Sequence, residues 1–298
     1  MSQFTAINLA LVAPPDVIDP LDFERILADM LADLLARAPE LDALVESEPS
    51  MKLLEVCAYR ELQLRARIND AARAVMLPYS AGADLENLGA LFGVERLEIS
   101  PADMSAIPPV PTVYESDSDF RYRIQLSLEG LSTAGPEGAY IYHALSADGQ
   151  VLDASATSPS PGQVVITVLS RAGSGVPSAP LLTTVLARLS AENVRPLTDY
   201  VQVQAATIVQ YQVNATLYFY AGPDREVIMA NARAALQAYT AGQHRLGLDV
   251  TLSGIYAALH QPGVQRVDLA SPTANLVINR QSASYCTAIT LSDGGLDE

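Results

Sequence analysis

The side chains that could carry out acid–base, nucleophilic or metal chemistry are few and far apart in this chain. It has three histidines, His143, His244 and His260, and two cysteines, Cys57 and Cys286. No histidine lies four residues from another or next to a cysteine, and neither cysteine has a C-x-x-C partner, so zinc-ligand spacing is absent. We therefore expect no metal, no cofactor and no disulfide, and two reduced, buried thiols.

An enzyme would need catalytic groups that only the fold brings together. His143 falls in an amphipathic helical segment, which predicts a partly buried residue, and His244 falls in a loop. The chain has no G-x-S-x-G elbow, which disfavours a serine hydrolase of that type. One alternative stays open: a hydrolase or transferase whose site forms around His143, Asp148 and Asp153.

Two further patterns resemble ligand sites only in part. Gly173-Ser174-Gly175 lacks the Lys-Ser/Thr of a P-loop and the third glycine of a dinucleotide fingerprint, so a tight turn is expected. Asp117 and Asp119, and the tail 293–298, are rich in oxygen atoms but offer fewer ligands than calcium requires. The sequence therefore predicts no catalytic, cofactor-binding or metal site.

The charge of the chain limits its partners. The formal net charge is −16, and the first 100 residues hold 17 acidic and 8 basic side chains, a net of −9. A surface that neutralises phosphates is therefore not expected, which makes nucleic acid a poor partner. Residues 1–15 lack a basic region before their short apolar run, and no apolar run could span a bilayer, so we expect a soluble, cytoplasmically made protein with no membrane partner.

The elements that position these residues begin with helices. Residues 20–38 show helical apolar spacing, with Asp19 or Asp22 as N-cap and Pro39 beyond the end. The apolar stripe consists of Phe23, Ile26, Leu27, Met30, Leu31, Leu34 and Leu35. This pattern predicts a strongly amphipathic helix.

Two more helices follow in the front third. One starts near Ser47 or Ser50 and runs to Leu77, a length of about 42 Å, with contacts expected on more than one side. Its apolar positions include Leu54 and Leu62. A short third helix is predicted with Asp84 as N-cap, and Gly93 is predicted to stop it in a left-handed conformation.

The chain then divides into segments of different composition. The prolines of 99–119 predict a linker with extended or polyproline-like stretches, followed by a short helix from Phe120 to Leu131. We expect four regions: a helical region (1–98), the proline-rich linker and short helix (99–135), and two small α/β domains (136–205 and 206–298).

The back half contains a weak internal repeat in which a short helix feeds a strand. Six identities relate the copies: Ile141/Ile255, Tyr142/Tyr256, Ala144/Ala258, Leu145/Leu259, Gly149/Gly263 and Asp153/Asp268. The alternation of helices and strands around each copy predicts a small mixed sheet covered by helices. The predicted fold class is thus α+β and multidomain, with a helical N-terminal region followed by two tandem α/β sandwich domains.

Several motifs, in their order along the chain, resemble the baseplate J-like family of contractile phage tails. They are Ala74 to Tyr79, Gly82 to Leu85, Leu91 to Arg96, Phe120-Arg121, Ser132 to Gly135, Ala139-Tyr140 to Asp153, Pro161 to Val164, and Gly263-Val264. The resemblance covers most of the chain from about Ser50 onward. The first helix fits it less distinctively.

The resemblance implies a structural role and no enzyme activity. Family members are baseplate wedge subunits of phages and of phage-tail-like bacteriocins. They join a smaller I-like wedge protein and a sheath-initiator protein, and two copies occupy one wedge. Six wedges then ring a central hub, and the ring widens when the sheath contracts. It also implies assembly in the bacterial cytoplasm and release as part of the particle.

On this basis we expect the front helices to join an intersubunit bundle. The expected interface residues are Phe23, Ile26, Leu27, Met30, Leu34, Leu54 and Leu62. The same stripe would equally serve a core within one chain. A receptor- or carbohydrate-binding module is a further alternative, although tryptophan is absent and Tyr211, Tyr218 and Tyr220 fit a strand pattern instead of an exposed aromatic cluster.

Overall fold

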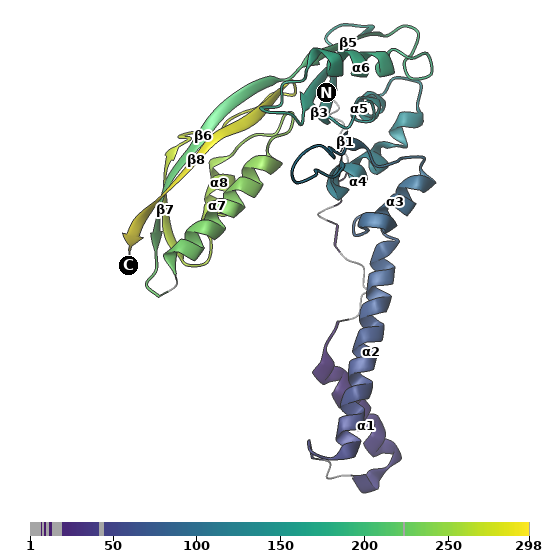
Figure 1. Cartoon of the computed structure of the whole chain (residues 1–298), viewed down its shortest axis with the longest axis vertical. Coiled ribbons are helices and arrows are strands. Elements are labelled where there is room, and N and C mark those ends of the chain that lie inside the picture. The colour runs from purple at the N-terminus through teal and green to yellow at the C-terminus, as the bar shows by residue number, and fades with distance from the viewer. Residues whose placement is uncertain are drawn as a thin grey trace. The chain divides into compact units, whose positions relative to one another are not determined.

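The computed structural model describes residues 7, 9, 12–13, 20–41, 45–222 and 224–297, and the chain forms two compact units (Figure 1). The helical unit contains the described residues before Leu97 together with Asp117–Arg121. The sheet unit contains Leu97–Ser116 and the described chain from Tyr122 onward. The fold is α+β and multidomain, as the sequence predicted.

The helical unit is built on two packed helices, α1 (Phe23–Arg37) and α2 (Pro49–Ala74) (Figure 1). The carboxylate of Asp22 caps α1 by accepting a hydrogen bond from the backbone N–H of Arg25 at 3.1 Å. Of the two predicted caps, Asp22 is thus confirmed, and Asp19 lies outside the described residues. A short 3-10 turn, Pro39–Leu41, follows α1.

The ends of the next two helices differ from the prediction. Helix α2 stops at Ala74 and not at Leu77, which precedes a proline and is therefore disfavoured in the helical conformation. Helix α3 (Gly82–Leu91) has Ala81 as its N-cap, so the prediction of Asp84 was wrong. Asp84 lies in the first turn, where the negative charge of its carboxylate interacts favourably with the helix dipole.

The predicted stop after α3 is confirmed. Gly93 adopts φ +68°, and the backbone N–H of Val94 donates to the carbonyl of Gly89 at 3.0 Å. A glycine is preferred there because a Cβ atom makes the left-handed conformation costly.

The proline-rich segment is an irregular antiparallel hairpin, which differs from the expected extended linker. Strands β1 (Glu98–Ser100) and β2 (Val113–Tyr114) pair, and Asp103 and Val110 exchange two backbone hydrogen bonds of 2.9 Å further along. The prolines are tolerated because they lie outside the paired positions. The predicted helix 120–131 is likewise split into α4 (Asp117–Leu126) and a 3-10 turn (Glu129–Leu131).

A buried ion pair closes the base of this hairpin. The side chains of Glu115 and Arg123 are 2% and 5% exposed and form a bidentate contact, with Arg123 Nε 3.0 Å from Glu115 Oε2. The Glu115 carboxylate also accepts from the N–H of Leu97 at 2.9 Å, and Arg123 donates to Ser146 Oγ at 3.2 Å. One pair thus joins the hairpin, α4 and the end of the next helix.

The first α/β domain contains two helices and a mixed sheet. Its elements are α5 (Glu137–Leu145), β3 (Val151–Thr157), β4 (Gln163–Ser170), α6 (Ala179–Leu189) and β5 (Tyr200–Ala205). The strand order is β3-β4-β5, with β3 antiparallel and β5 parallel to the central β4. A mixed sheet with helices is the arrangement that the sequence predicted for this domain.

The second α/β domain has a longer sheet with two helices over one face (Figure 1). Its elements are β6 (Thr207–Phe219), α7 (Arg225–Gly242), α8 (Leu252–Leu259), β7 (Val264–Ser271) and β8 (Ser282–Leu296). The order β7-β6-β8 has one antiparallel and one parallel neighbour around the central strand, as in the first domain. The core includes Leu217, Phe219, Leu236, Ile255 and Leu259.

The two copies of the internal repeat therefore have the same arrangement of strands in space, but their elements follow a different order along the chain. The repeated helix–strand pair is α5–β3 in the first domain, before the central strand, and α8–β7 in the second, after it. The glycines at the matching positions of the two copies sit where a side chain would clash: a Cβ on Gly149 would lie 2.1 Å from the carbonyl oxygen of Glu98, and one on Gly263 would lie 2.4 Å from Ile228 Cδ1. Close packing explains why both copies have glycine there.

Within the sheet unit, a single buried residue links the last strand of the first α/β domain to the first strand of the second, and further contacts hold the two domains together. Ala206, 6% exposed, separates β5 from β6, donates to the carbonyl of Val168 at 3.0 Å and packs against Leu169 and Ala283. Arg280 forms an ion pair with Glu137, and its carbonyl accepts from Ser155 Oγ. The connection is thus a packed joint and not a free linker.

We predict that Glu115→Ala lowers the free energy of unfolding of the whole chain by about 3–5 kcal/mol, because Arg123 would be left buried without its partner. Urea denaturation followed by circular dichroism measures this change. The control is Glu55→Ala, which removes the surface pair with Lys52 and is expected to cost less than about 1 kcal/mol. Equal effects of the two substitutions would contradict the structural importance of the buried pair.

Candidate assembly interface

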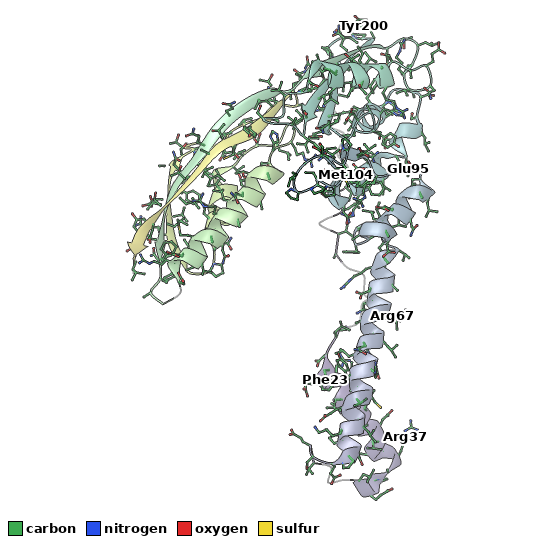
Figure 2. All side chains as sticks on the ribbon, viewed as in Figure 1. Phe23, Arg37, Arg67, Glu95, Met104 and Tyr200 are labelled. Atoms are coloured by element: carbon green, nitrogen blue, oxygen red, sulfur yellow. The ribbon has the colours of Figure 1, made fainter. Side chains whose placement is uncertain are left out.

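The predicted interface residues of the first helix lie on the side of α1 that packs along α2. Ile26 is only 2% exposed, and Phe23, Leu27, Met30 and Leu34 are half-buried. Phe23, at the start of α1, is labelled in Figure 2. The apolar stripe of α1 therefore contributes to packing within one chain. A further role between subunits stays a prediction.

The two interface residues predicted on α2 share that helix's inner side. Leu54 and Leu62 flank the fully buried Ala58 at four-residue spacing and are themselves half-buried. A second set of apolar side chains stays exposed: Leu53, Val56, Leu64 and Ile68 on α2, and Val75 directly after it. Contacts on more than one side of this helix were predicted, but Leu53, Val56 and Leu64 were not singled out. Their spacing of three or four residues, or sums of these, was the available signal.

The residues considered for an enzyme site have structural partners. The Nε2 atom of His143 lies 3.1 Å from the carbonyl oxygen of Gly130. Asp148 accepts a hydrogen bond from the N–H of Gln150, and Asp153 accepts one from the N–H of Leu246. Both carboxylates thus hold backbone groups, and these contacts favour a structural role for all three.

Of the acidic pair Asp117 and Asp119, which the sequence predicted to have too few ligands for calcium, Asp117 contacts an arginine. Asp117 lies 2.6 Å from Arg96 Nη2 and accepts the N–H of Gly82 at 3.2 Å. Burial alone would raise the pKa of Asp117, but its hydrogen bonds with Arg96 and Gly82 lower it overall. Among the described residues, no group of three or more His, Cys, Asp or Glu side chains could hold a metal ion.

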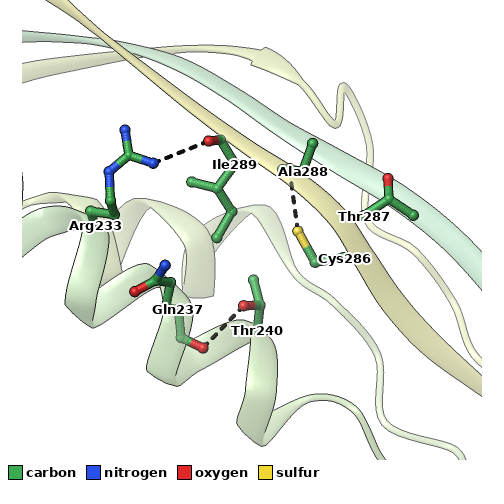
Figure 3. Close-up of a pocket in the computed structure, with 7 residues that line it drawn as sticks. All are labelled: Arg233, Gln237, Thr240, Cys286, Thr287, Ala288 and Ile289. Atoms are coloured by element: carbon green, nitrogen blue, oxygen red, sulfur yellow. Dashed lines mark hydrogen bonds between the residues drawn. The ribbon is translucent and has the colours of Figure 1, made fainter. Parts of the chain in front are cut away.

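The cysteines are free, but the prediction that both are buried was wrong for Cys57, which is exposed on α2. Cys286 is half-buried in a hollow of about 330 Å³ between α7 and β8 (Figure 3). Burial raises the pKa of the Cys286 thiol, so the protonated and less nucleophilic form predominates. The arginine beside it, Arg233, donates to the carbonyl of Ile289 at 3.2 Å.

The remaining sequence patterns also have structural explanations. Gly173 and Gly175 have φ values of +58° and +101° and form the expected turn. Tyr211 is 7% exposed, and the Tyr218 ring lies 3.9 Å below the guanidinium of Arg266, so neither presents a free aromatic surface. No helix in the described parts of the chain has the length and apolar character to cross a membrane.

These observations define a class of protein: a multidomain α+β chain with apolar side chains exposed on a long helix, a type of surface that mediates contacts between proteins. Three descriptions of one family match the chain in order: the baseplate J-like N-terminal domain at 46–103, the central domain at 132–205 and the C-terminal domain at 211–292. The chain belongs to the baseplate J-like family, as its motifs suggested.

The match to an individual relative extends over nearly the whole chain. It is 54% identical over 299 residues to baseplate protein J of Escherichia phage P2, spanning 98% of this chain and 99% of that protein. A solved structure, the 6-fold symmetrised baseplate of the anti-feeding prophage, aligns with a TM-score of 0.41 and 14% identity. That alignment covers 61% of this chain and 44% of the other.

We predict that His143 makes stability decrease as the pH falls. Burial, and secondly the charge of Arg188, lower the pKa of folded His143, although its contact with Gly130 opposes this. The unfolded chain therefore binds a proton near pH 6.5 more readily than the folded chain, and each pH unit below that value costs at most about 1.4 kcal/mol.

The measurement is urea denaturation between pH 7.5 and 5.5. His143→Gln should show a smaller loss of stability over this range than the unmodified chain. His260→Gln, which changes an exposed histidine, is the matched control and should leave the slope unchanged. An unchanged slope for His143→Gln would refute the assignment.

Proposed function

We propose that this protein is a structural wedge subunit of the baseplate of a contractile phage tail. The observation that carries the proposal is the 54% identity to a baseplate protein J over 98% of this chain. The residues once considered for an enzyme site, His143, Asp148 and Asp153, instead contact backbone groups, which supports a structural role. The proposed function is assembly, with no enzymatic reaction.

The proposed partners follow from the family. They are a second copy of this chain, the smaller I-like wedge protein, the sheath-initiator protein, neighbouring wedges and the hub. In this proposal the helical unit joins the intersubunit bundle, the two α/β domains meet neighbouring subunits, and wedges form a ring that widens as the sheath contracts. The protein is then assembled in the bacterial cytoplasm and released as part of the particle.

We assign the proposed roles to four regions of the chain. They are the helical region (1–98), the proline-rich region and short helix (99–135), and the two α/β domains (136–205 and 206–298). Packing at Ala206 supports movement of the two α/β domains together, since the joint between them is buried. A change of shape during contraction would then occur before residue 136.

The test is co-expression with the I-like wedge protein, followed by light scattering to measure the mass of the purified product. We expect a stable complex that contains two copies of this 31.7 kDa chain for each partner. A monomer that does not bind the partner would contradict the wedge assignment.

We predict that Leu27→Asp with Leu34→Asp abolishes this complex and particle assembly. Two carboxylates in the half-buried stripe of α1 would disrupt packing against α2 and any bundle built on it. Co-purification and particle yield measure the effect, and circular dichroism reports whether the α/β domains stay folded. Asp29→Asn with Asp33→Asn, on the exposed side of α1, is the control; normal assembly of the leucine variant would show that the stripe is not needed.

A further inference from the structure

Strand β8 lies at the edge of the second sheet, and most of its outer side has no strand beside it. It pairs with β6 along its length, while β7 lies on the other side of β6. On the outer side of β8, Ala283 pairs with Leu246 near the start of the strand. From Tyr285 to Leu296, no backbone group of the described chain pairs with β8 on that side. An unpaired edge of this kind is a template for a further strand.

The backbone groups that point outward belong to particular residues of β8. The carbonyl of Ile289 accepts a hydrogen bond from Arg233 of α7 at 3.2 Å, and so points away from β6. The register between β8 and β6 is regular from Ile289 to Asp293. The N–H and C=O of one residue point to the same side of a strand, and this side alternates along the chain. Leu291 and Asp293 therefore present their backbone groups outward as well.

This part of the edge lacks the features that usually prevent strand pairing. Residues 287–292 contain no proline and no charged side chain. A hollow of about 330 Å³ lies between the edge and α7, lined by Arg233, Gln237 and Thr240 and by residues 286–289 (Figure 3). We call this hollow, together with the edge from 286 to 293, the β8 groove. Its place between an edge strand and a helix suits an extended chain.

Arg233 brings a positive charge to the β8 groove without a carboxylate partner in the described chain. It is exposed, and its hydrogen bond to the carbonyl of Ile289 leaves most of its N–H donors unused. At the far end of the edge, the carboxylate of Asp293 already pairs with Arg225 at 3.0 Å. A guanidinium binds a carboxylate through two parallel hydrogen bonds, so the groove favours an acidic ligand.

We propose that the β8 groove binds an extended, acidic segment of another protein, which adds a strand to the sheet beside β8. Backbone hydrogen bonds to Ile289, Leu291 and Asp293 supply the affinity, and a carboxylate side chain at Arg233 supplies the specificity. The inference goes beyond the proposed function, because this peptide site does not depend on the wedge assignment.

The probes are three synthetic peptides of about nine residues with alternating threonine and valine. The first has a central glutamate, the second a central lysine, and the third is the glutamate peptide with its backbone nitrogens methylated. Fluorescence anisotropy measures their binding to the full-length chain at low and high salt. At low salt we expect the glutamate peptide to bind about tenfold more tightly than either of the others. Its advantage over the lysine peptide should shrink at high salt.

The thiol of Cys286 reports whether the hollow is occupied. In a Cys57→Ser chain, Cys286 is the remaining cysteine and can be followed with a thiol reagent. The glutamate peptide at ten times its Kd should slow this reaction about tenfold, because only the free chain reacts. In a Cys286→Ser chain, the exposed Cys57 on α2 should react at an unchanged rate.

A charge reversal in the groove makes the test specific. Arg233→Glu should reverse the preference, so that the lysine peptide binds more tightly than the glutamate peptide. Arg67→Glu is the matched control, because Arg67 is an exposed arginine on α2, outside the β8 groove, and its replacement should leave the preference unchanged (Figure 2).

Four outcomes would overturn the proposal. They are equal binding of the glutamate and lysine peptides, equal binding of the methylated and unmethylated peptides, an unprotected Cys286, and no binding by a chain that circular dichroism shows to be folded. A dimer of this chain in light scattering that Arg233→Glu dissociates would also overturn it, since a second copy would then occupy the groove. None of these measurements involves the I-like protein, so failure here is distinguishable from failure of the wedge assignment.

Discussion

The buried pair of Glu115 and Arg123 is the constraint on which the organisation of this protein depends. The chain changes units at residues 96/97 and 116/117 and again inside α4, so three crossings occur within a short stretch. The pair holds Leu97, the base of the hairpin and α4 in one network within the sheet unit. A buried charge tolerates no loss of its partner, so the pair specifies how the hairpin packs on the end of α4 within the sheet unit.

In the helical unit, a second network of ion pairs and hydrogen bonds lies near the points where the chain passes between units, and its side chains are more exposed. Arg96 pairs with Glu86 and Asp117, and Arg121 donates to the carbonyls of Leu77 and Ser80. These bonds satisfy the backbone groups left free at the end of α2 and before α3. Each unit therefore has its own polar anchor where the chain leaves it.

The two α/β domains show how one sheet layout tolerates different chain orders. In both, the central strand has one antiparallel and one parallel neighbour. Moving the repeated helix–strand pair from before the central strand to after it preserves these contacts, because sheet packing depends on which strands are neighbours and not on their order in the chain. The joint at Ala206 then fixes one domain on the other. For an assembly subunit, such a pair offers extended, firmly connected surfaces.

The sequence alone determined the types of the elements, because apolar periodicity and glycine or proline stop signals act locally. Helix α1, the end of α3 at Gly93 and the strands of both α/β domains follow from these local patterns. Only the tertiary structure decided which face of α2 is covered, that Cys57 is exposed, and that the prolines of 99–119 belong to a hairpin. These features depend on pairing between residues distant in sequence, and amphipathicity shows that a face is apolar without showing what covers it.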